Sequence, residues 1–198
     1  MRLVALLIGY AFGAVSSAYI LGKFYGIDIR EHGSKNAGMT NVNRILGKKP
    51  AVFVFLFDVA KAIAAFLIAT TFLNSSPLLG LYAGLGVVLG HDFPFYLKFR
   101  GGKGIASTLG VIIMFDFRVA IVAFTVGLVL VLVFRYISLA SLMITLLFPI
   151  LLAVFSHPPE AVGIAVIITA LAWILHRDNI IKLWNGNENK FSLKSEKK

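Results

Sequence analysis

Long stretches without any charged residue limit what this chain can become. Residues 3–22, 62–90, 119–134 and 136–156 contain no Asp, Glu, Lys or Arg. A helix that crosses the hydrocarbon core of a bilayer needs about 20 predominantly apolar residues. Charged residues make up only 14% of the sequence, whereas soluble domains carry about a quarter. The chain is therefore predicted to be an all-α integral membrane protein.

Seven transmembrane helices are predicted from the apolar runs and the residues that bound them. Pro50, Pro77 and Pro159 suit the first turns of helices. The third and fourth helices are short for a full span. Either they tilt little and extend past flanking charges whose side chains snorkel to the interface, or they form a re-entrant hairpin. Because the first run is long and further spans follow, we interpret it as a retained helix rather than a signal peptide. The predicted helices cover residues 3–22, 50–73, 77–90, 104–115, 119–135, 139–156 and 160–175.

Glycines spaced four residues apart predict close contacts between these helices, because they let two backbones approach. The sequence has no convincing internal repeat, which weakens an inverted-repeat transporter. We expect a monomer with one membrane domain over residues 1–198 and working loops at about 23–49, 91–103 and 176–190. The glycine pairs are Gly9/Gly13, Gly80/Gly84 and Gly86/Gly90.

The positive charges predict the orientation. Sixteen of the 19 Lys and Arg residues fall in residues 23–49, 92–103, Arg135 and the tail after His176, which are predicted to share one side. Cytoplasmic loops carry such an excess, so the N-terminus is expected outside and the C-terminus in the cytoplasm. This bias also explains the net charge of +10. Nucleic-acid binding is not indicated, because no basic, base-stacking face fits between the apolar runs.

The first cytoplasmic segment has the composition of a phosphate site. Ser, Thr and Asn side chains, with backbone amides exposed by glycine, can surround phosphate oxygens. Arg44 would add a bidentate, charge-assisted contact. The alternative is a flexible, solvated loop. The candidate residues are Ser34, Asn36, Thr40 and Arg44.

The second segment places Gly101, Gly102, Lys103 and Gly104 directly before an apolar helix. Backbone N–H groups and the positive end of the helix dipole favour an anion at such a position. The segment is not a Walker A loop, because Leu97 replaces the first glycine and Gly104 replaces the Ser or Thr. A glycine-rich turn with a snorkelling Lys103 is the alternative interpretation.

Two histidines, His91 and His176, are predicted at similar depth near the cytoplasmic interface, with Asn179 following the second. They could be acid–base groups or phosphate donors, or they could satisfy carbonyls at helix ends. A metal site is the weakest option and no metal is expected, because no cysteine or carboxylate cluster accompanies them.

Asp58 and Lys61 lie three residues apart inside the second predicted helix, so they can pair on one helix face. Charges within the membrane are costly and often functional. A structural pair that orients the cytoplasmic loops is equally consistent with the sequence.

Together, these segments resemble the signature motifs of the bacterial acyl-phosphate:glycerol-3-phosphate acyltransferases of the PlsY type. Chain length, seven spans, an external N-terminus and the order of the motifs agree with that family. The resemblance implies acyl transfer from acyl phosphate to the sn-1 hydroxyl of glycerol 3-phosphate, giving lysophosphatidic acid without a cofactor at the inner membrane. The motifs are Gly33-Ser34-Lys35-Asn36-Ala37-Gly38-Met39-Thr40-Asn41, Gly90-His91, Gly101-Gly102-Lys103-Gly104 and His176-Arg177-Asp178-Asn179-Ile180.

The resemblance also implies roles for the candidate residues. Lys103 and the Gly101–Gly104 amides would hold one phosphate, and Arg44 with its polar neighbours the other, in an order left open. Either histidine, or the dianion of glycerol 3-phosphate, would take the proton from the attacking hydroxyl; we favour the dianion. The implied catalytic residues are Ser34, Lys103, His176 and Asn179.

Competing functions have less support. No Asp stands five residues after any of the four histidines, as thioester-dependent glycerolipid acyltransferases require, and no Gly-x-Ser-x-Gly elbow is present. A small transporter for a phosphorylated anion is the main alternative, but only Asp58 and Lys61 offer charge at bilayer depth. A purely structural scaffold would leave the three polar segments unexplained.

Overall fold

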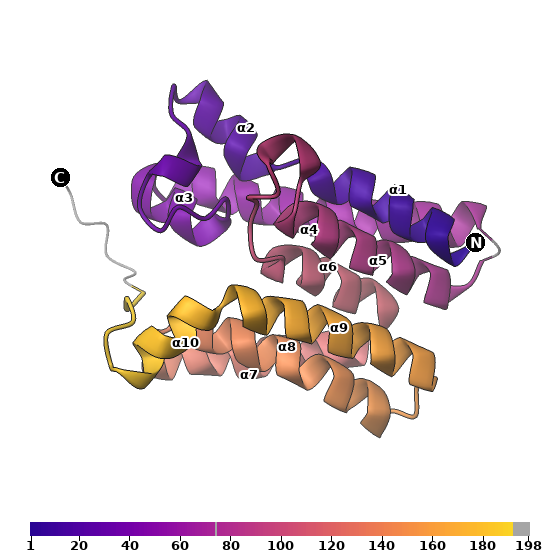
Figure 1. The fold of residues 1–198 in the computed structure, drawn as a ribbon. Helices are drawn as coiled ribbons and strands as arrows, with labels where there is room; N and C mark the ends of the chain where they lie inside the picture. The colour runs from indigo at the N-terminus through magenta and orange to yellow at the C-terminus, as the bar shows by residue number, and fades with distance from the viewer. Residues whose placement is uncertain (74, 192–198) are drawn as a thin grey trace. The chain divides into compact units, whose positions relative to one another are not determined.

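The computed structural model describes residues 1–73 and 75–191, and every regular element in these ranges is helical (Figure 1). The predicted all-α fold is therefore confirmed for the described residues. The chain divides into two compact units, unit 1 (Met1–Asp116) and unit 2 (Phe117–Lys198). Unit 1 contains α1 (Arg2–Ala14), α2 (Ser17–Phe24), η1 (Ile29–Glu31), α3 (Met39–Ile45), α4 (Lys48–Phe72), α5 (Pro77–Asp92), η2 (Phe95–Leu97) and α6 (Ile105–Phe115); unit 2 contains α7 (Phe117–Phe134), α8 (Ile137–Val154), α9 (Pro159–Leu175) and α10 (Arg177–Trp184).

Five segments are long and apolar enough to cross a membrane: Arg2–Phe24, Lys48–Phe72, Pro77–Leu97, Phe117–Phe134 and Ile137–Val154. A sixth is obtained if α9 and α10, which meet at a bend of 63°, are counted together. With 11 residues, α6 is shorter than a span. The structure thus supports five or six spans among the described residues. Seven full spans are not confirmed, and the external N-terminus stays a prediction.

Glycines bring α1 and α5 into backbone contact. A Cβ at Gly9 would overlap the Ala83 carbonyl, and a Cβ at Gly86 would overlap the Leu6 carbonyl. Gly90 meets the Tyr10 carbonyl in the same way. Helix association within a bilayer depends on close packing of this kind. The glycine spacing therefore predicted helix contacts correctly.

We expect Gly86→Leu to destabilise unit 1, because its side chain would have to displace α1. Overpacking a tight contact costs about 1–3 kcal/mol or more. Thermal unfolding of the detergent-solubilised protein should show a lower Tm. Gly163→Leu is the matched control, because nothing lies within 4 Å of a Cβ at Gly163. An unchanged Tm for Gly86→Leu would contradict the close α1–α5 contact.

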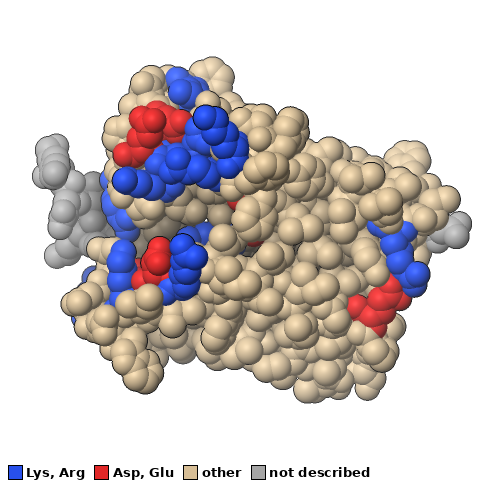
Figure 2. Space-filling view, viewed as in Figure 1, with Lys and Arg blue, Asp and Glu red and all other residues tan. Residues whose placement is uncertain are grey.

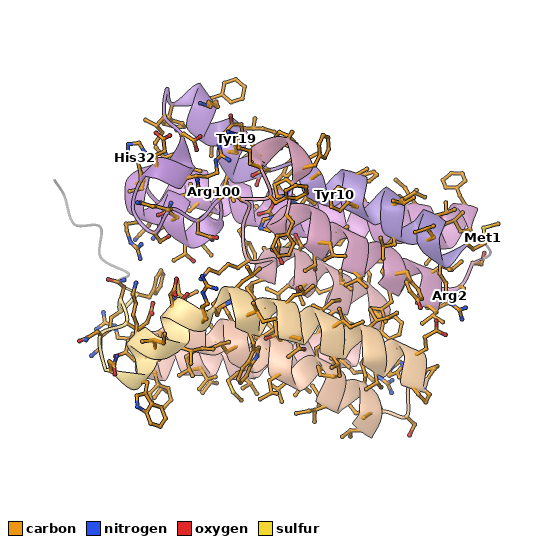
Figure 3. All side chains as sticks on the ribbon, in the orientation of Figure 1. Met1, Arg2, Tyr10, Tyr19, His32 and Arg100 are labelled. Carbon is orange, nitrogen blue, oxygen red and sulfur yellow. The ribbon has the colours of Figure 1, made fainter. Side chains whose placement is uncertain are left out.

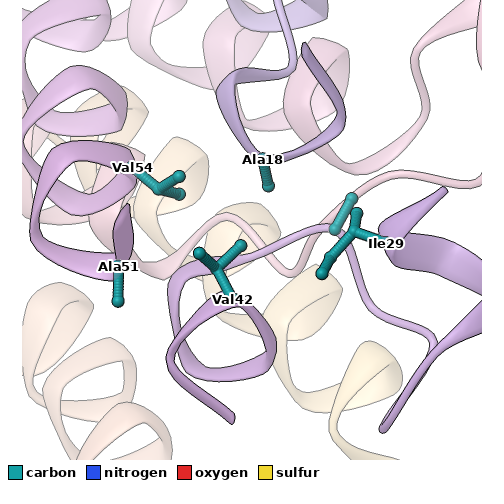
Figure 4. Packing of buried hydrophobic residues seen from close by; sticks show 6 residues of the cluster. Ala18, Ile29, Val42, Ala51 and Val54 are labelled. Carbon is teal, nitrogen blue, oxygen red and sulfur yellow. The ribbon is translucent and has the colours of Figure 1, made fainter. Parts of the chain in front are cut away.

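The segment predicted as a loop over residues 23–49 is a folded lobe. Side chains from α2, the turn at η1, α3 and α4 meet there in an apolar cluster (Figure 4). The sequence missed α3 because its seven residues are mostly polar and carry little hydrophobic signal. The lobe holds the first polar segment in place. Its buried residues are Ala18, Ile29, Ala37, Val42, Ala51 and Val54.

Unit 2 is built from helix hairpins. Gly127 of α7 packs against Ile144 of α8, and Thr169 of α9 donates to the Thr145 carbonyl of α8 at 2.6 Å. α10 follows the bend at His176 and exposes Trp184 almost completely. The sequence analysis treated residues 176–190 as a loop, whereas the structure makes most of that segment a helix.

Candidate functional site

Basic side chains of unit 1 gather at one end, around α2, α3 and the segment before α6, away from the N-terminus (Figures 1 and 2). Such a cluster creates a positive potential that attracts anions. Both polar segments of unit 1 lie at this end. The exposed basic residues are Lys23, Lys35, Arg44, Lys98 and Arg100, with Lys48 and Lys49 at the start of α4.

The glycine loop (residues 101–104) folds back onto the end of α5. The amides of Gly101 and Gly102 donate to the carbonyls of Asp92 and His91, both at 3.0 Å. The sequence analysis assigned these two amides to phosphate, but the structure shows them bonded to α5. Lys103, half-buried between them and α6, is the cation of the loop.

One backbone bond joins the two polar segments. The amide of Ala37 donates to the Gly101 carbonyl at 3.2 Å. Because Ala37 lies between Asn36 and Thr40, this bond sets the first segment beside the glycine loop. The segments that the sequence separates by about 60 residues are therefore neighbours in unit 1, as a two-phosphate site requires.

Tyrosines attach the turn between α5 and α6 to the first helix. Tyr10 donates to the Phe93 carbonyl at 2.7 Å, and Figure 3 shows its position on α1. Tyr96 donates to the Ala14 carbonyl at 2.8 Å. These two tyrosines hold the start of the loop against α1.

Asn41 organises the first segment and was not selected among the candidate site residues. Its side chain accepts from the Ser34 amide at 2.9 Å and donates to the Ile29 and His32 carbonyls, both at 3.0 Å. It is fully buried. Ser34, by contrast, is exposed. Within the motif, Asn41 thus shapes the loop, whereas Ser34 presents a polar group to the exterior. Thr40 and Arg44 are also exposed.

Arg30 joins the lobe to the α5–α6 turn. Arg30 contacts Asp28 at 2.7 Å and also donates to the Leu97 carbonyl at 3.0 Å. Hydrogen bonding from the Arg30 side chain, opposed by burial and aided by the Arg30 amide, lowers the pKa of Asp28 to about 2. The folded protein therefore favours the ionised carboxylate.

Asp28 should make stability depend on pH. Its pKa falls from 3.8 to about 2 on folding, so its contribution is complete above pH 4 and is lost as the pH falls towards 2. Asp28→Asn should lower the unfolding free energy near neutral pH, with the difference from wild type shrinking in acid. Denaturant titrations at several pH values would measure it. A difference that grows on acidification would contradict the assigned pKa.

A second acidic residue missed by the sequence analysis lies beneath the glycine loop. Asp92 is 2% exposed, and its carboxylate oxygens accept no hydrogen bond from the described residues. A Cβ at Gly104 would lie 3.1 Å from one of them, and Gly104 has a φ of +66°. Both facts favour glycine at position 104.

The predicted pair of Asp58 and Lys61 is present, with 2.8 Å between Oδ1 and Nζ. It lies at a break between α1 and α2 that the sequence did not predict. Ser17, the first residue of α2, donates to Asp58 at 3.0 Å. His91 faces the pair and is only 5% exposed, so the structure places it behind the glycine loop instead of on its surface.

In unit 2, His176 is buried and its Nδ1 lies 2.7 Å from the Ala172 carbonyl. A carbonyl only accepts, so Nδ1 carries a proton and Nε2 of the neutral ring is the basic nitrogen. Asn179 donates to both carboxylate oxygens of Glu188 at 3.2 Å. No group of three His, Cys, Asp or Glu able to hold a metal occurs among the described residues.

Sequence comparison assigns a family to most of the chain. The glycerol-3-phosphate acyltransferase family matches residues 3–186. A glycerol-3-phosphate acyltransferase from Shouchella clausii is 41% identical over 198 residues, covering 97% of each chain. One from Aquifex aeolicus is 38% identical over 189 residues, covering 96% of this chain and 98% of its own.

Two solved structures have the same fold. Both are crystal structures of PlsY (YgiH), an integral membrane glycerol 3-phosphate acyltransferase, and both are 37% identical to this chain. The glycerol 3-phosphate form superposes with a TM-score of 0.90 and covers 96% of each chain. The lysophosphatidic acid form has a TM-score of 0.86, covering 96% of this chain and 95% of that one.

Proposed function

The chain belongs to the glycerol-3-phosphate acyltransferase family, and from this premise we propose that it acylates glycerol 3-phosphate with acyl phosphate as donor. The sn-1 hydroxyl attacks the acyl carbon, the bond from that carbon to the phosphate oxygen breaks, and lysophosphatidic acid and inorganic phosphate leave. The bond from Ala37 to Gly101 carries this proposal, because it brings two phosphate-type segments together in unit 1.

The proposed roles follow the placement of the side chains. Lys103 holds one phosphate at the glycine loop, whose Gly101 and Gly102 give it shape and whose Gly104 leads into α6. The exposed Arg44, with its polar neighbours Ser34, Asn36 and Thr40, holds the other. His176 and Asn179 of unit 2 are further proposed catalytic residues. An acyl phosphate already has a good leaving group, so no covalent enzyme intermediate is needed.

The acyl chain has an apolar site in unit 1. A small, partly open apolar pocket of about 130 Å³ lies between α2 and α4. Ser17 lines it and also bonds Asp58, so the pocket begins beside the polar end of the unit. Part of a hydrocarbon chain can pack there against side chains that are as apolar as lipid, so the pocket can orient the chain. The other lining residues are Ile20, Leu21, Phe24, Phe53 and Phe57.

Purified protein in detergent tests the function. Palmitoyl phosphate and glycerol 3-phosphate should give inorganic phosphate and lysophosphatidic acid in equal amounts, and palmitoyl-CoA should give neither. Product formation from the thioester alone would overturn the proposed donor. Activity that requires sealed vesicles would instead favour a transporter. The active site is proposed to lie on the cytoplasmic face of the inner membrane. Vesicles of known orientation test this, because only one orientation should use glycerol 3-phosphate added outside.

We expect His176→Asn to keep the rising limb of the pH–rate profile, because the substrate dianion, with a pKa of about 6, takes the hydroxyl proton itself. His157→Asn is the matched control in unit 2. Loss of the limb together with a fall in kcat of about 10²–10⁴-fold would instead identify His176 as the general base.

A further inference from the structure

The proposed reaction leaves a buried polar group of unit 1 without a role. Asp58, Lys61 and His91 are 1%, 5% and 5% exposed. Burying charge inside a membrane helix is costly, and an ion pair of this kind adds little net stability by itself. They lie directly behind the glycine loop, where His91 contacts Gly102.

The surroundings of Lys61 fix its protonation. Its Nζ lies 2.8 Å from Asp58 Oδ1 and donates to the Gly13 and Val15 carbonyls at 3.1 and 3.0 Å. All three neighbours are oxygens that only accept. A neutral amine has two protons and cannot serve three acceptors, whereas an ammonium group can. Lys61 is therefore charged, and its three N–H bonds are shared among these oxygens and a fourth neighbour, the Nδ1 atom of His91.

The charge on Lys61 in turn selects one tautomer of His91. Nδ1 of His91 lies 3.0 Å from Lys61 Nζ, and an ammonium group has no lone pair to accept a proton. Asp58 Oδ1 is 3.6 Å from Nδ1, too far for a hydrogen bond. Nδ1 is thus the acceptor, and the proton of the neutral ring resides on Nε2.

The protonated edge of His91 faces the glycine loop. Nε2 is the atom that a Cβ at Gly102 would overlap. The backbone of the same histidine accepts from the Gly102 amide at 3.0 Å. His91 therefore supports Gly102 with both its ring and its carbonyl, next to Lys103.

We propose that Asp58 and Lys61 are positioning residues for the glycine loop and act through the Nε2–H tautomer of His91. The inference rests on the proposed function, because it assigns phosphate binding to that loop. Asp58 holds the Lys61 ammonium group in place, and Lys61 selects the tautomer of the His91 ring. The ring in turn packs against Gly102 and so positions the backbone next to Lys103. The same pair joins α1 to α2, so the loop is held against the broken first helix.

Ring-nitrogen NMR of protein labelled with ¹⁵N-histidine tests the tautomer without any turnover. His91→Gln identifies the signals by their loss. Wild type should show a protonated Nε2 and an unprotonated Nδ1 for His91, and Lys61→Met should abolish that preference. A protonated Nδ1 in wild type would overturn the proposal, even if acyl transfer is confirmed.

Kinetics test the positioning role separately. The Gln amide reaches where Nε2 lies, whereas the Asn amide reaches only to Nδ1, so His91→Gln should retain more activity than His91→Asn. Lys61→Met should raise KM for one phosphorylated substrate at least about tenfold, because phosphate binding loses free energy. Thr70→Val, also in α4, is the control, because among the described residues Thr70 bonds to carbonyls of its own helix.

The outcomes separate the two proposals. An inactive wild type would sink the proposed function and leave the NMR result standing. A merely structural role predicts that Lys61→Met lowers kcat and Tm with both KM values unchanged, and that His91→Gln and His91→Asn are equally impaired. Either of these results would overturn the positioning role.

Discussion

Lys103→Ala is expected to lower kcat/KM for acyl transfer by about 10²–10³-fold, the loss typical of removing one preorganised hydrogen-bond donor. The half-buried Lys103 sits in a loop whose backbone is bonded to α5 at Gly101 and Gly102. With those two amides bonded to α5, the ammonium group is the strongest donor this loop can offer a phosphate. Steady-state rates of phosphate and lysophosphatidic acid release measure the effect.

Arg100→Ala provides the matched control for Lys103→Ala. Arg100 is exposed, three residues earlier in the same segment, and its removal lowers the positive charge by the same amount. If general basicity were all that mattered, both variants would lose activity equally. We expect Arg100→Ala to stay within about threefold of wild type, since an exposed charge is screened by salt.

Gly102→Ala is expected to have an effect of similar size for a different reason. The new Cβ would overlap His91 Nε2, so either the ring or the loop must move. A misplacement of about 1 Å at a catalytic group can cost about 10²-fold in rate. Activity should therefore fall by about that factor while the protein still folds, because only one turn is disturbed.

Gly163→Ala is the control here, because it lies in α9 with nothing within 4 Å of its added Cβ. Alanine is favoured over glycine in a helix by roughly 0.5–1 kcal/mol, so this variant should be active and no less stable than wild type. Full activity of Gly102→Ala would show that the loop tolerates a side chain, against the packing described for His91.

The helices could be predicted because the residues that determine each one lie within its own stretch of sequence. Apolar runs and first-turn prolines located α4, α5 and α9 to within a few residues, and glycine spacing located the contact between α1 and α5. The break after Ala14 could not be predicted in this way. It depends on Lys61 and Asp58, which lie more than 40 residues later.

The residue types of the candidate site could be predicted from the sequence, whereas the burial of individual residues could not. Sequence analysis placed His91 near the cytoplasmic interface as an acid–base group or phosphate donor, but its ring is buried beneath the loop that follows it. Asn41 and Asp92 were not selected, because a buried amide and a buried carboxylate are identified only by what surrounds them. Composition predicts a phosphate site, and packing shows which of the candidate residues are buried and which are exposed.

The break in the first helix bears on the order of assembly during synthesis. The carbonyls of Gly13 and Val15 are satisfied by Lys61, which is made and inserted later. Before then, an unbroken first helix is the conformation that bonds these groups internally, as a bilayer demands. The Gly13 and Val15 carbonyls therefore gain their partner only when α4 packs against the first helix, after both have been synthesised.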